Sequence, residues 1–503
     1  MSNNAFYGLH VAKTGLFASQ KGLELTGHNI SNAGTEGYTR QRLNLTNLEG
    51  ATTDAIILQA TNGQVGRGVG VVNIQQIRDQ FLDAQYRDEC SEQKMWETRY
   101  ETLYYVEDII HEPTDIGLSS VLLKFYESLQ EFAKEPQSED IRNLVRQNAI
   151  TMTESMNHYA GKLEALQKEQ DDAIVITTKQ INAYLNDIAA LNTAIRKYEL
   201  NGENANDLMD KRNLAMDKLS ELIDISYKYN EHNMVSIYFG NDNTTLIDNE
   251  TAINAVNLFE ITEGGQSHYG SYTFHDVSVN GVTVDRSNIS GGTMKGYYNM
   301  RDGSASEDYG LDFIMQQFDL LSDGIVKIFN KINSEGYSIP DEENGNKSQQ
   351  GLLFFDESDT SALHMQISDD LKQSVWNIAG SDAEVDLDAE NTNEGNNKNA
   401  LRFAAVSQTN YDDLGIGRID DFLAGIVSEI GVQAEYTKTM NENQEIIMDS
   451  IYAQRQSVSG VSIDEEVTNI ITFSKSYQAA SRMITAVDEM LDKLINGTGV
   501  VGR

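Results

Sequence analysis

Cysteine, proline and tryptophan are scarce in this chain of 503 residues, which holds one, three and two of them. A single cysteine, Cys90, excludes a disulfide within the chain and any zinc site built on cysteines. The three prolines, Pro113, Pro136 and Pro340, leave long stretches free to form unbroken helices. The scarcity of these residues favours a mainly helical fold without covalent cross-links.

Basic residues are also few, with 38 Lys and Arg against 77 Asp and Glu and a formal net charge of −39. Such a chain would add to the charge of a nucleic acid instead of releasing its counterions, so nucleic acids are excluded as partners. The same repulsion excludes anionic membranes. The simplest role of the charge is to keep the protein soluble.

No run of about 20 apolar residues is present, so the sequence predicts no transmembrane helix. The N-terminus also lacks a basic region followed by an apolar core, so no cleavable signal is predicted. By these two rules the chain would be cytoplasmic. That expectation holds only if no other export route exists.

Motifs of catalysis and cofactor binding are missing as well: the sequence holds no H-E-x-x-H, no nucleophile elbow and no P-loop. Its G-x-G-x-x-G string, residues 497–502, follows a helical pattern instead of leading from a strand into a helix. The pair His268 and His275 lacks a third metal ligand. The acidic run 382–390 lacks the glycine-centred spacing of a calcium loop. We therefore predict no enzyme activity, no metal and no cofactor.

What the chain does contain is a succession of long helical patterns, several of them well above the mean helix length of about 11–12 residues. Patterns of this length predict an elongated helical bundle. The predicted helices cover residues 4–33, 80–112, 118–135, 138–200, 206–224, 308–335, 397–409, 418–457 and 464–495.

Two regions have the alternation and the turn residues of β-structure. Residues 39–79 alternate and are rich in glycine, and the composition changes again at Ile225. A hairpin is predicted around Asn280-Gly281, a pair that favours the tight turn between antiparallel strands. The fold class is therefore mainly α with a β-rich insertion.

We predict three discontinuous domains. The first is a terminal coiled-coil domain, in which both chain ends meet. The second is a helical core, and the third is a β-rich outer domain. Their boundaries are 1–50 with 464–503, 51–224 with 293–337 and 396–463, and 225–292 with 338–395.

Heptad patterns occupy both ends of the chain, and a seven-residue apolar period is typical of coiled coils. In the first helix the repeating residues are Leu9, Leu16, Leu23 and Ile30, each of the first three followed three positions later by the small Ala12, Ser19 and Thr26. In the last helix two series repeat: Ile470, Tyr477, Ile484 and Leu491, and Phe473, Ala480, Val487 and Leu494.

These two helices are predicted to pair and to bring the chain ends together. Helices of this kind are weak without a partner surface. We therefore expect residues 1–45 and 465–503 to be mobile in the free monomer.

Between the first helix and the first strand lies the stretch GHNISNAGTEGYTRQRLNL, residues 27–45. Asn29 and Asn32 are suited to ending a helix by side-chain hydrogen bonds. Gly34 and Gly37 permit a positive φ. Tyr38 supplies a rigid amphipathic anchor. The stretch therefore predicts a specific turn that sets the angle at which the chain leaves the helix.

This stretch resembles the N-terminal signature of the bacterial flagellar axial proteins, at Asn29, Asn32, Gly37, Tyr38 and Arg40. That signature is common to rod, hook and junction proteins. Three further stretches resemble the hook-associated protein 1 family, whose members form the first hook–filament junction. They are residues 66–87, 291–302 and 459–497.

The resemblance implies a structural junction protein, exported unfolded by the flagellar type III system and located outside the cell. The implied partners are further copies of the chain in a ring, the hook protein, the second junction protein (hook-associated protein 3) and an export chaperone. The heptad residues and the turn residues would carry self-assembly. Two alternatives remain: another axial protein of the hook type, or an adhesin or enzyme carried on the β-rich middle.

Overall fold

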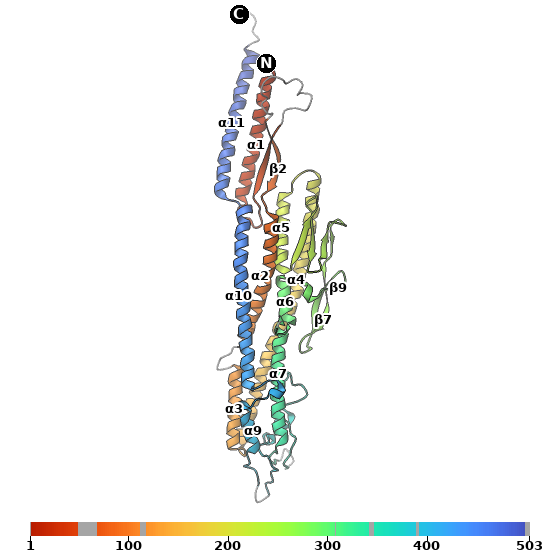
Figure 1. The fold of residues 1–503 in the computed structure, drawn as a ribbon, viewed down its shortest axis with the longest axis vertical. Coiled ribbons are helices and arrows are strands. Elements are labelled where there is room, and N and C mark those ends of the chain that lie inside the picture. The colour runs from red at the N-terminus through yellow and green to blue at the C-terminus, as the bar shows by residue number, and fades with distance from the viewer. Residues whose placement is uncertain are drawn as a thin grey trace. The chain divides into compact units, whose positions relative to one another are not determined.

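The computed structural model describes residues 2–48, 68–110, 117–306, 308–341, 347–388 and 392–497, and these residues confirm a mainly helical fold (Figure 1). The helices are α1 (Ser2–Ser31), α2 (Gln80–Ile110), α3 (Leu118–Lys134), α4 (Glu139–Leu200), α5 (Asn206–Leu222), α6 (Gly292–Asp302), α7 (Leu311–Glu335), α8 (Asp369–Gln373), α9 (Lys398–Ala405), α10 (Ile419–Ser459) and α11 (Ile463–Asn496).

The strands are short and form small antiparallel sheets. One pairs β1 with β2, one has the order β3-β4-β5-β6, one has the order β7-β8-β9, and one pairs β10 with β11. Their bounds are β1 Gln41–Asn47, β2 Val69–Gln76, β3 Ile225–Tyr229, β4 Val235–Phe239, β5 Thr244–Asp248, β6 Ala255–Val256, β7 Phe259–Gln266, β8 Thr273–Val279, β9 Val282–Thr283, β10 Ser304–Ala305 and β11 Asp308–Tyr309.

Every predicted helix is present, with ends that differ by a few residues. The predicted hairpin turn is confirmed between β8 and β9, where Asn280 and Gly281 have φ values of 55° and 72°. Several sequence features lie outside the described residues: the middle of the predicted strand region (49–67), Pro113, Glu390 and most of the glycine string near the C-terminus. Within the described ranges, no helix is both long and apolar enough to cross a membrane.

Two helices were not predicted: the short α8, and α6, which covers most of the stretch 291–302 that carried the family resemblance. Its glycines allow close packing against α2. A Cβ on Gly291 would lie 2.3 Å from the Ser91 hydroxyl oxygen, and one on Gly296 would lie 2.6 Å from the Thr98 Cβ. Glycine normally weakens a helix, which is why the pattern gave no helical signal. Here it brings two helices into backbone contact.

The chain divides into two compact units, and each is built from separated segments. The first contains residues 1–90, 182–258 and 446–503, and the second contains 91–181 and 259–445. This division differs from the three domains that the sequence predicted. The predicted β-rich domain is split, because residues 225–258 belong to the first unit and 259–292 to the second.

The prediction that residues 338–395 are β-rich is wrong for the described part of that segment, whose extended pairing consists of isolated bridges. Instead the segment contributes Phe354, Phe355, Met365 and Leu371 to the hydrophobic core of the second unit, and all four are at most 1 % exposed. Short apolar runs between turns do not reveal which surface they cover, so the sequence pattern could not place them.

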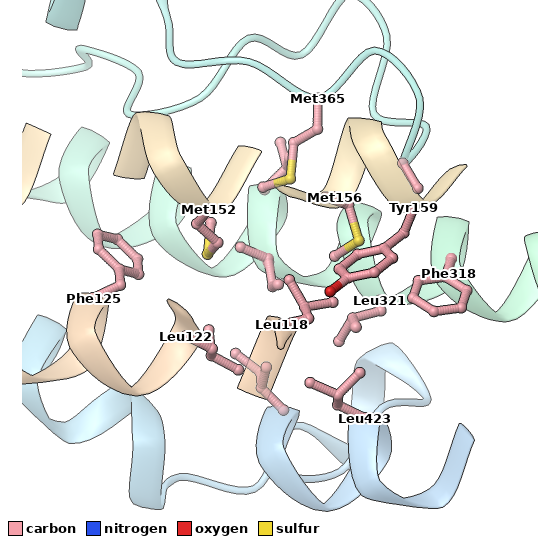
Figure 2. Packing of buried hydrophobic residues seen from close by; sticks show 14 of the residues in the cluster. Leu118, Leu122, Phe125, Met152, Met156, Tyr159, Phe318, Leu321, Met365 and Leu423 are labelled. Atoms are coloured by element: carbon pink, nitrogen blue, oxygen red, sulfur yellow. The ribbon is translucent and has the colours of Figure 1, made fainter. Parts of the chain in front are cut away.

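The core of the second unit is built by α3, α4, α7 and α10 together with this segment. Figure 2 shows Leu118, Met156, Phe318 and Leu423, one from each of these helices, pointing into a common interior, with Met365 closing it from the loop side. Aromatic rings fill another part of the same core around Phe329.

Buried amides on α7 hold residues 352–379 in place of a regular sheet. The Asn330 side chain donates to the Phe355 carbonyl (2.9 Å) and accepts from the Phe354 amide (2.9 Å). Asn333 donates to the Leu352 carbonyl (3.0 Å) and accepts from the Ala379 amide (2.8 Å). These side chains satisfy backbone groups that burial would otherwise leave unpaired.

Candidate functional site: the terminal helix pair and its turn

Helices α1 and α11 lie side by side in the first unit (Figure 1). A Cβ on Gly22 would lie 2.6 Å from the Phe473 ring, and one on Gly8 would lie 3.9 Å from Val487. Asn29 donates to Glu466 (3.2 Å). From Gly8 to Asn29 the contacts advance along α1, while their partners in α11 run backwards from Val487 to Glu466. The helices are therefore antiparallel, and they keep one register over three heptads.

Contacts with α11 therefore lie at Gly8, Gly22 and Asn29, one residue before the predicted heptad residues Leu9, Leu23 and Ile30. A role of Leu9, Leu16, Leu23 and Ile30 in self-assembly stays a prediction. Leu9, Leu16, Leu23 and Ile30 are half-buried along the edge of the contact, while the small Ala12, Ser19 and Thr26 are buried. Glycine lets the two backbones approach closely, a preference that apolar periodicity does not show.

In α11, Phe473 and Val487 of the predicted heptad face α1. Val487 is buried, and Ile470, Phe473, Ile484 and Leu491 are half-buried. Two members of the pattern are instead exposed, Tyr477 at 38 % and Leu494 at 53 %. The predicted pairing of the two helices is present within the single chain, and the mobility of the chain ends in the free monomer stays a prediction.

Asn29 is the polar centre of the pair and is 1 % exposed. Its amide nitrogen donates to the Gln41 carbonyl (2.9 Å) and to Glu466 (3.2 Å). Its oxygen accepts from the Tyr38 hydroxyl (2.7 Å) and from the Gln41 amide (3.2 Å). All four hydrogen-bonding positions of the side chain are used, so this residue joins α1, the turn, β1 and α11.

Arg40 forms the second link between the turn and α11. Its guanidinium donates to Glu466 (2.8 Å) and to Glu465 (2.6 Å), and its backbone amide donates to the Ser459 carbonyl (2.9 Å). The Glu466 side chain is 2 % exposed, while that of Glu465 is 62 % exposed. The buried pair therefore bears most of the electrostatic coupling, because the exposed one is screened by water.

The turn itself follows the predicted chemistry at most positions. Asn32 ends the helix by donating from its side chain to the His28 carbonyl (3.0 Å) and by accepting from the Thr35 hydroxyl (3.3 Å). Gly37 has a φ of 77°, and a Cβ there would meet Leu214 of α5 at 3.0 Å. Gly34 does not adopt the positive φ that glycine permits, and it has open space around it.

Tyr38 anchors the turn through its hydroxyl group. Since this hydroxyl donates its proton to Asn29, the 3.0 Å contact with Nδ1 of His28 requires the imidazole to donate there. Burial raises the pKa of Tyr38 above its ordinary value, and the nearby Asp210 and Asp207 carboxylates raise it further. The phenol therefore stays protonated and able to donate.

The strand that follows the turn is held on α5 by a second set of side chains. Asp210 accepts from the Thr39 amide (3.2 Å) and from Gln76 (2.9 Å), and Gln41 donates to Asp207 (3.1 Å). Burial raises the pKa of Asp210 to about 6, against the opposing effect of its hydrogen bond from Thr39. The turn is thus fixed on both sides, by α11 and by α5.

A buried charge cluster beside the turn was missed by the sequence analysis. Arg455 of α10 reaches Asp83 (2.8 Å) and Asp217 (2.6 Å), and Arg87 reaches Asp217 (2.7 Å). Burial alone would raise the pKa of Asp217, but Arg87 and Arg455 outweigh it and hold this pKa below its ordinary value. Arg87 and Asp83 lie four residues apart, a spacing usually found on exposed helix faces, so the sequence gave no sign of burial.

Across the described ranges, no group of three or more His, Cys, Asp or Glu side chains is arranged to hold a metal ion. His268 and His275, which the sequence left as possible neighbours, bind separate carboxylates: His268 lies between Asp312 and Asp319, and His275 contacts Asp171.

Two family models match parts of this chain. Residues 103–354 match the model described as the flagellar hook-associated protein FlgK helical domain. Residues 453–497 match the model of the C-terminal region of the flagellar basal body rod FlgEFG proteins. The second match is shared with rod proteins, so the middle of the chain discriminates better than its end.

Full-length relatives decide between the axial families. Flagellar hook-associated protein 1 of Bacillus subtilis (strain 168) is 30 % identical over 521 residues, covering 99 % of this chain and all of that protein. The chain belongs to the flagellar hook-associated protein 1 family. The Salmonella typhimurium protein of the same name is 22 % identical and covers 96 % of this chain and 98 % of its own length.

A solved structure has the same fold. It is the structure of the flagellar hook junction protein FlgK from Burkholderia pseudomallei, which matches with a TM-score of 0.60 at 13 % identity. The match covers 75 % of this chain and 100 % of the other. This comparison therefore confirms the mainly helical fold.

Proposed function

We propose that this chain is the structural protein that joins the hook of a bacterial flagellum to its filament and is required for filament assembly. The observation that carries the proposal is the full-length match to a flagellar hook-associated protein 1. The flagellar type III system exports the chain to the outside of the cell. Its partners there are the hook protein on one side and hook-associated protein 3 on the other, after an export chaperone has released it.

Self-assembly uses the terminal helix pair. α11 turns one face to α1 and leaves apolar side chains on its other faces, among them Met483 (50 % exposed), Met490 (56 %) and Leu494 (53 %). In the single chain these side chains gain nothing from the hydrophobic effect. In a ring of copies they are buried by neighbouring helix pairs, together with the half-buried Leu9, Leu16, Leu23 and Ile30 of α1.

Part of the predicted three-domain organisation is kept in this proposal, namely the terminal domain and a separate helical core. The helix pair with its turn is the assembly module. The second unit, with its own core, is carried by that module. The turn at Asn29, Asn32, Gly37, Tyr38 and Arg40 transmits the orientation of the pair to β1 and α5.

The direct test is genetic replacement. A strain that lacks its own junction protein should produce hooks without filaments in electron micrographs, and expression of this chain should restore filaments and motility. If the strain with the gene removed still carried filaments of normal length and number, the proposed function would be wrong.

A pair of variants tests the assembly module separately. Met490→Asp places a charge on the exposed apolar face and should prevent filament formation while the purified monomer melts as before, because an exposed change costs about 0.5 kcal/mol or less. The control is Thr485→Asp, at a neighbouring exposed polar position, which should retain filaments. Equal motility of the two variants would contradict the role of this face.

A further inference from the structure

A small pocket of about 290 Å³ lies in the second unit, between α7, α9 and the segment that leads from α9 to α10. Its floor is apolar and includes Ile328 and Ile332 of α7, Ala405 of α9 and Leu414 of the connecting segment. This volume is at the lower end of the range for ligand pockets. It therefore suits a single aliphatic side chain better than a cofactor.

The rim of the pocket is basic in a chain that is otherwise acidic. Lys327, Lys331 and Arg402 line it, and Asp413 is its one acidic lining residue. Lys327 already pairs with Asp323 (2.6 Å) and Arg402 with Glu335 (2.5 Å). Among the described residues no carboxylate pairs with Lys331, so this ammonium group is available to a ligand.

An exposed turn on the same unit has the complementary chemistry. Leu387 is 47 % exposed and stands between the exposed Asp386 and Asp388. The Asp388 amide donates to the Asp386 carboxylate (3.0 Å), and Val385, which is 2 % exposed, ties the turn to the protein. The turn therefore presents one aliphatic side chain with a carboxylate on each side.

We propose that this pocket receives Asp386-Leu387-Asp388 from a second copy of the chain. Leu387 covers the apolar floor, and the flanking carboxylates approach Lys331 and the outer hydrogen-bond donors of Lys327 and Arg402. Burial of one half-exposed leucine contributes only a small hydrophobic free energy, so a single contact is weak. It becomes effective when the helix pairs already hold the copies together, since linked contacts act at a high effective concentration.

The pocket and the turn are different surfaces, so the contact is head-to-tail. When two copies are joined, the turn of one copy and the pocket of the other remain free to bind further copies. Contacts of this kind close into a ring when the rotation per copy allows it. The inference rests on the proposed function, and it adds a contact made by the second unit to the contact made by the helix pairs.

Cross-linking between two versions of the full chain tests the contact. One version carries Lys331→Cys and the other Asp388→Cys, and both are expressed together in a strain that lacks its own junction protein. The native Cys90 is 3 % exposed and should not compete. After treatment of purified flagella with a short bis-maleimide, we expect a product of twice the chain mass that contains both versions.

The matched control replaces the second version by Asp369→Cys, at an acidic side chain that is 98 % exposed and lies outside the turn. Its cross-link to Lys331→Cys should be at least tenfold weaker. Leu387→Ser combined with Asp388→Cys should lower the yield severalfold, because the apolar contact is lost.

Three outcomes would overturn the inference. The first is the absence of the mixed product from flagella that carry normal filaments, which leaves the proposed function intact. The second is a chain with both cysteines that cross-links only within itself. The third is attachment of the Lys331→Cys version to a different flagellar protein. Failure of the unmodified chain to restore filaments is a separate result, and it bears on the proposed function instead.

Discussion

Helices α7 and α11 are both long and amphipathic, but they differ in how many of their residues are buried. Fourteen of the 25 residues of α7 are buried, whereas two of the 34 residues of α11 are, namely Glu466 and Val487. In α7, Phe329 meets four aromatic rings from three other segments: Phe125, Phe354, Phe355 and Phe403, at centroid distances of 5.2–5.8 Å.

The difference shows where each helix obtains its stability. α7 is covered by its own chain and gains the hydrophobic free energy on folding. α11 is covered on one face by α1, and its remaining apolar side chains, such as Ile471 (55 % exposed) and Ile495 (69 %), gain nothing until another surface covers them. The second unit therefore has an extensive core of its own, while the terminal pair is held within the chain by few buried side chains and by the polar links of Asn29 and Arg40.

The largest effect should come from emptying the aromatic core. Phe329→Ala should lower the free energy of unfolding of the second unit by about 3–5 kcal/mol, since the cavity is lined by packed rings. The control is Phe81→Ala at a phenylalanine that is 73 % exposed, which should cost about 0.5 kcal/mol or less. Chemical denaturation of both proteins checks this, and similar losses would contradict the contrast between the regions.

The terminal pair should depend on one buried carboxylate. Glu466→Ala leaves Arg40 and Asn29 without their buried partner and should weaken the α1–α11 pair by about 3 kcal/mol. Glu465→Ala removes the exposed partner of the same arginine and should cost about 0.5 kcal/mol. Hydrogen exchange in α1 and α11 measures both. Matching exchange rates in the two variants would show that burial does not decide the strength of this link.

The stability of the second unit, unlike that of the terminal pair, should depend on pH through His268. Both imidazole nitrogens of His268 face carboxylates of α7, Asp312 (2.7 Å) and Asp319 (2.8 Å), so both must donate and the ring is charged. Burial by itself would lower the pKa of His268, but these hydrogen bonds raise it to about 9. A raised pKa means that this stabilisation is complete below the unfolded value of about 6.5 and is lost as the pH rises through about 9.

The corresponding measurement compares the native chain with His268→Gln from pH 6 to pH 10. Below about pH 6.5 the native chain should be more stable by roughly 3 kcal/mol, and the difference should vanish above about pH 9. Stability of the terminal pair should not follow this curve, since His268 lies in the other unit. A difference that stayed constant over the whole range would exclude a charged His268.

The smallest effect separates the two glycines of the turn. Gly37→Ala combines a positive φ with a contact at Leu214 and should cost about 1–2 kcal/mol. Gly34→Ala should be neutral or stabilise by up to about 1 kcal/mol, because alanine restricts the unfolded chain and meets nothing in the folded one. Thermal unfolding of the first unit would reveal the order, and the reverse order would show that the turn conformation is misassigned.

Local pattern was sufficient for much of this fold. The helices from α2 to α5 follow from apolar periodicity, and the β8–β9 turn follows from Asn280-Gly281, since each depends on residues close in sequence. The turn residues Asn29, Gly37 and Tyr38 were also identified from sequence, although their partners were not. Glu466 is far away in the chain, and no local pattern indicates that it reaches Asn29.

By itself, the sequence determined the helical fold class, the family and the position of the first turn, because these reside in short stretches with a recurring period or motif. The tertiary structure decided which face of each element is covered. It placed Gly8 and Gly22 at the α1 contact, buried Phe354, Phe355, Met365 and Leu371 in the core of the second unit, and enclosed Arg87 and Asp217. Burial of one segment depends on another that lies far away in the chain, so it is a property of the assembled fold.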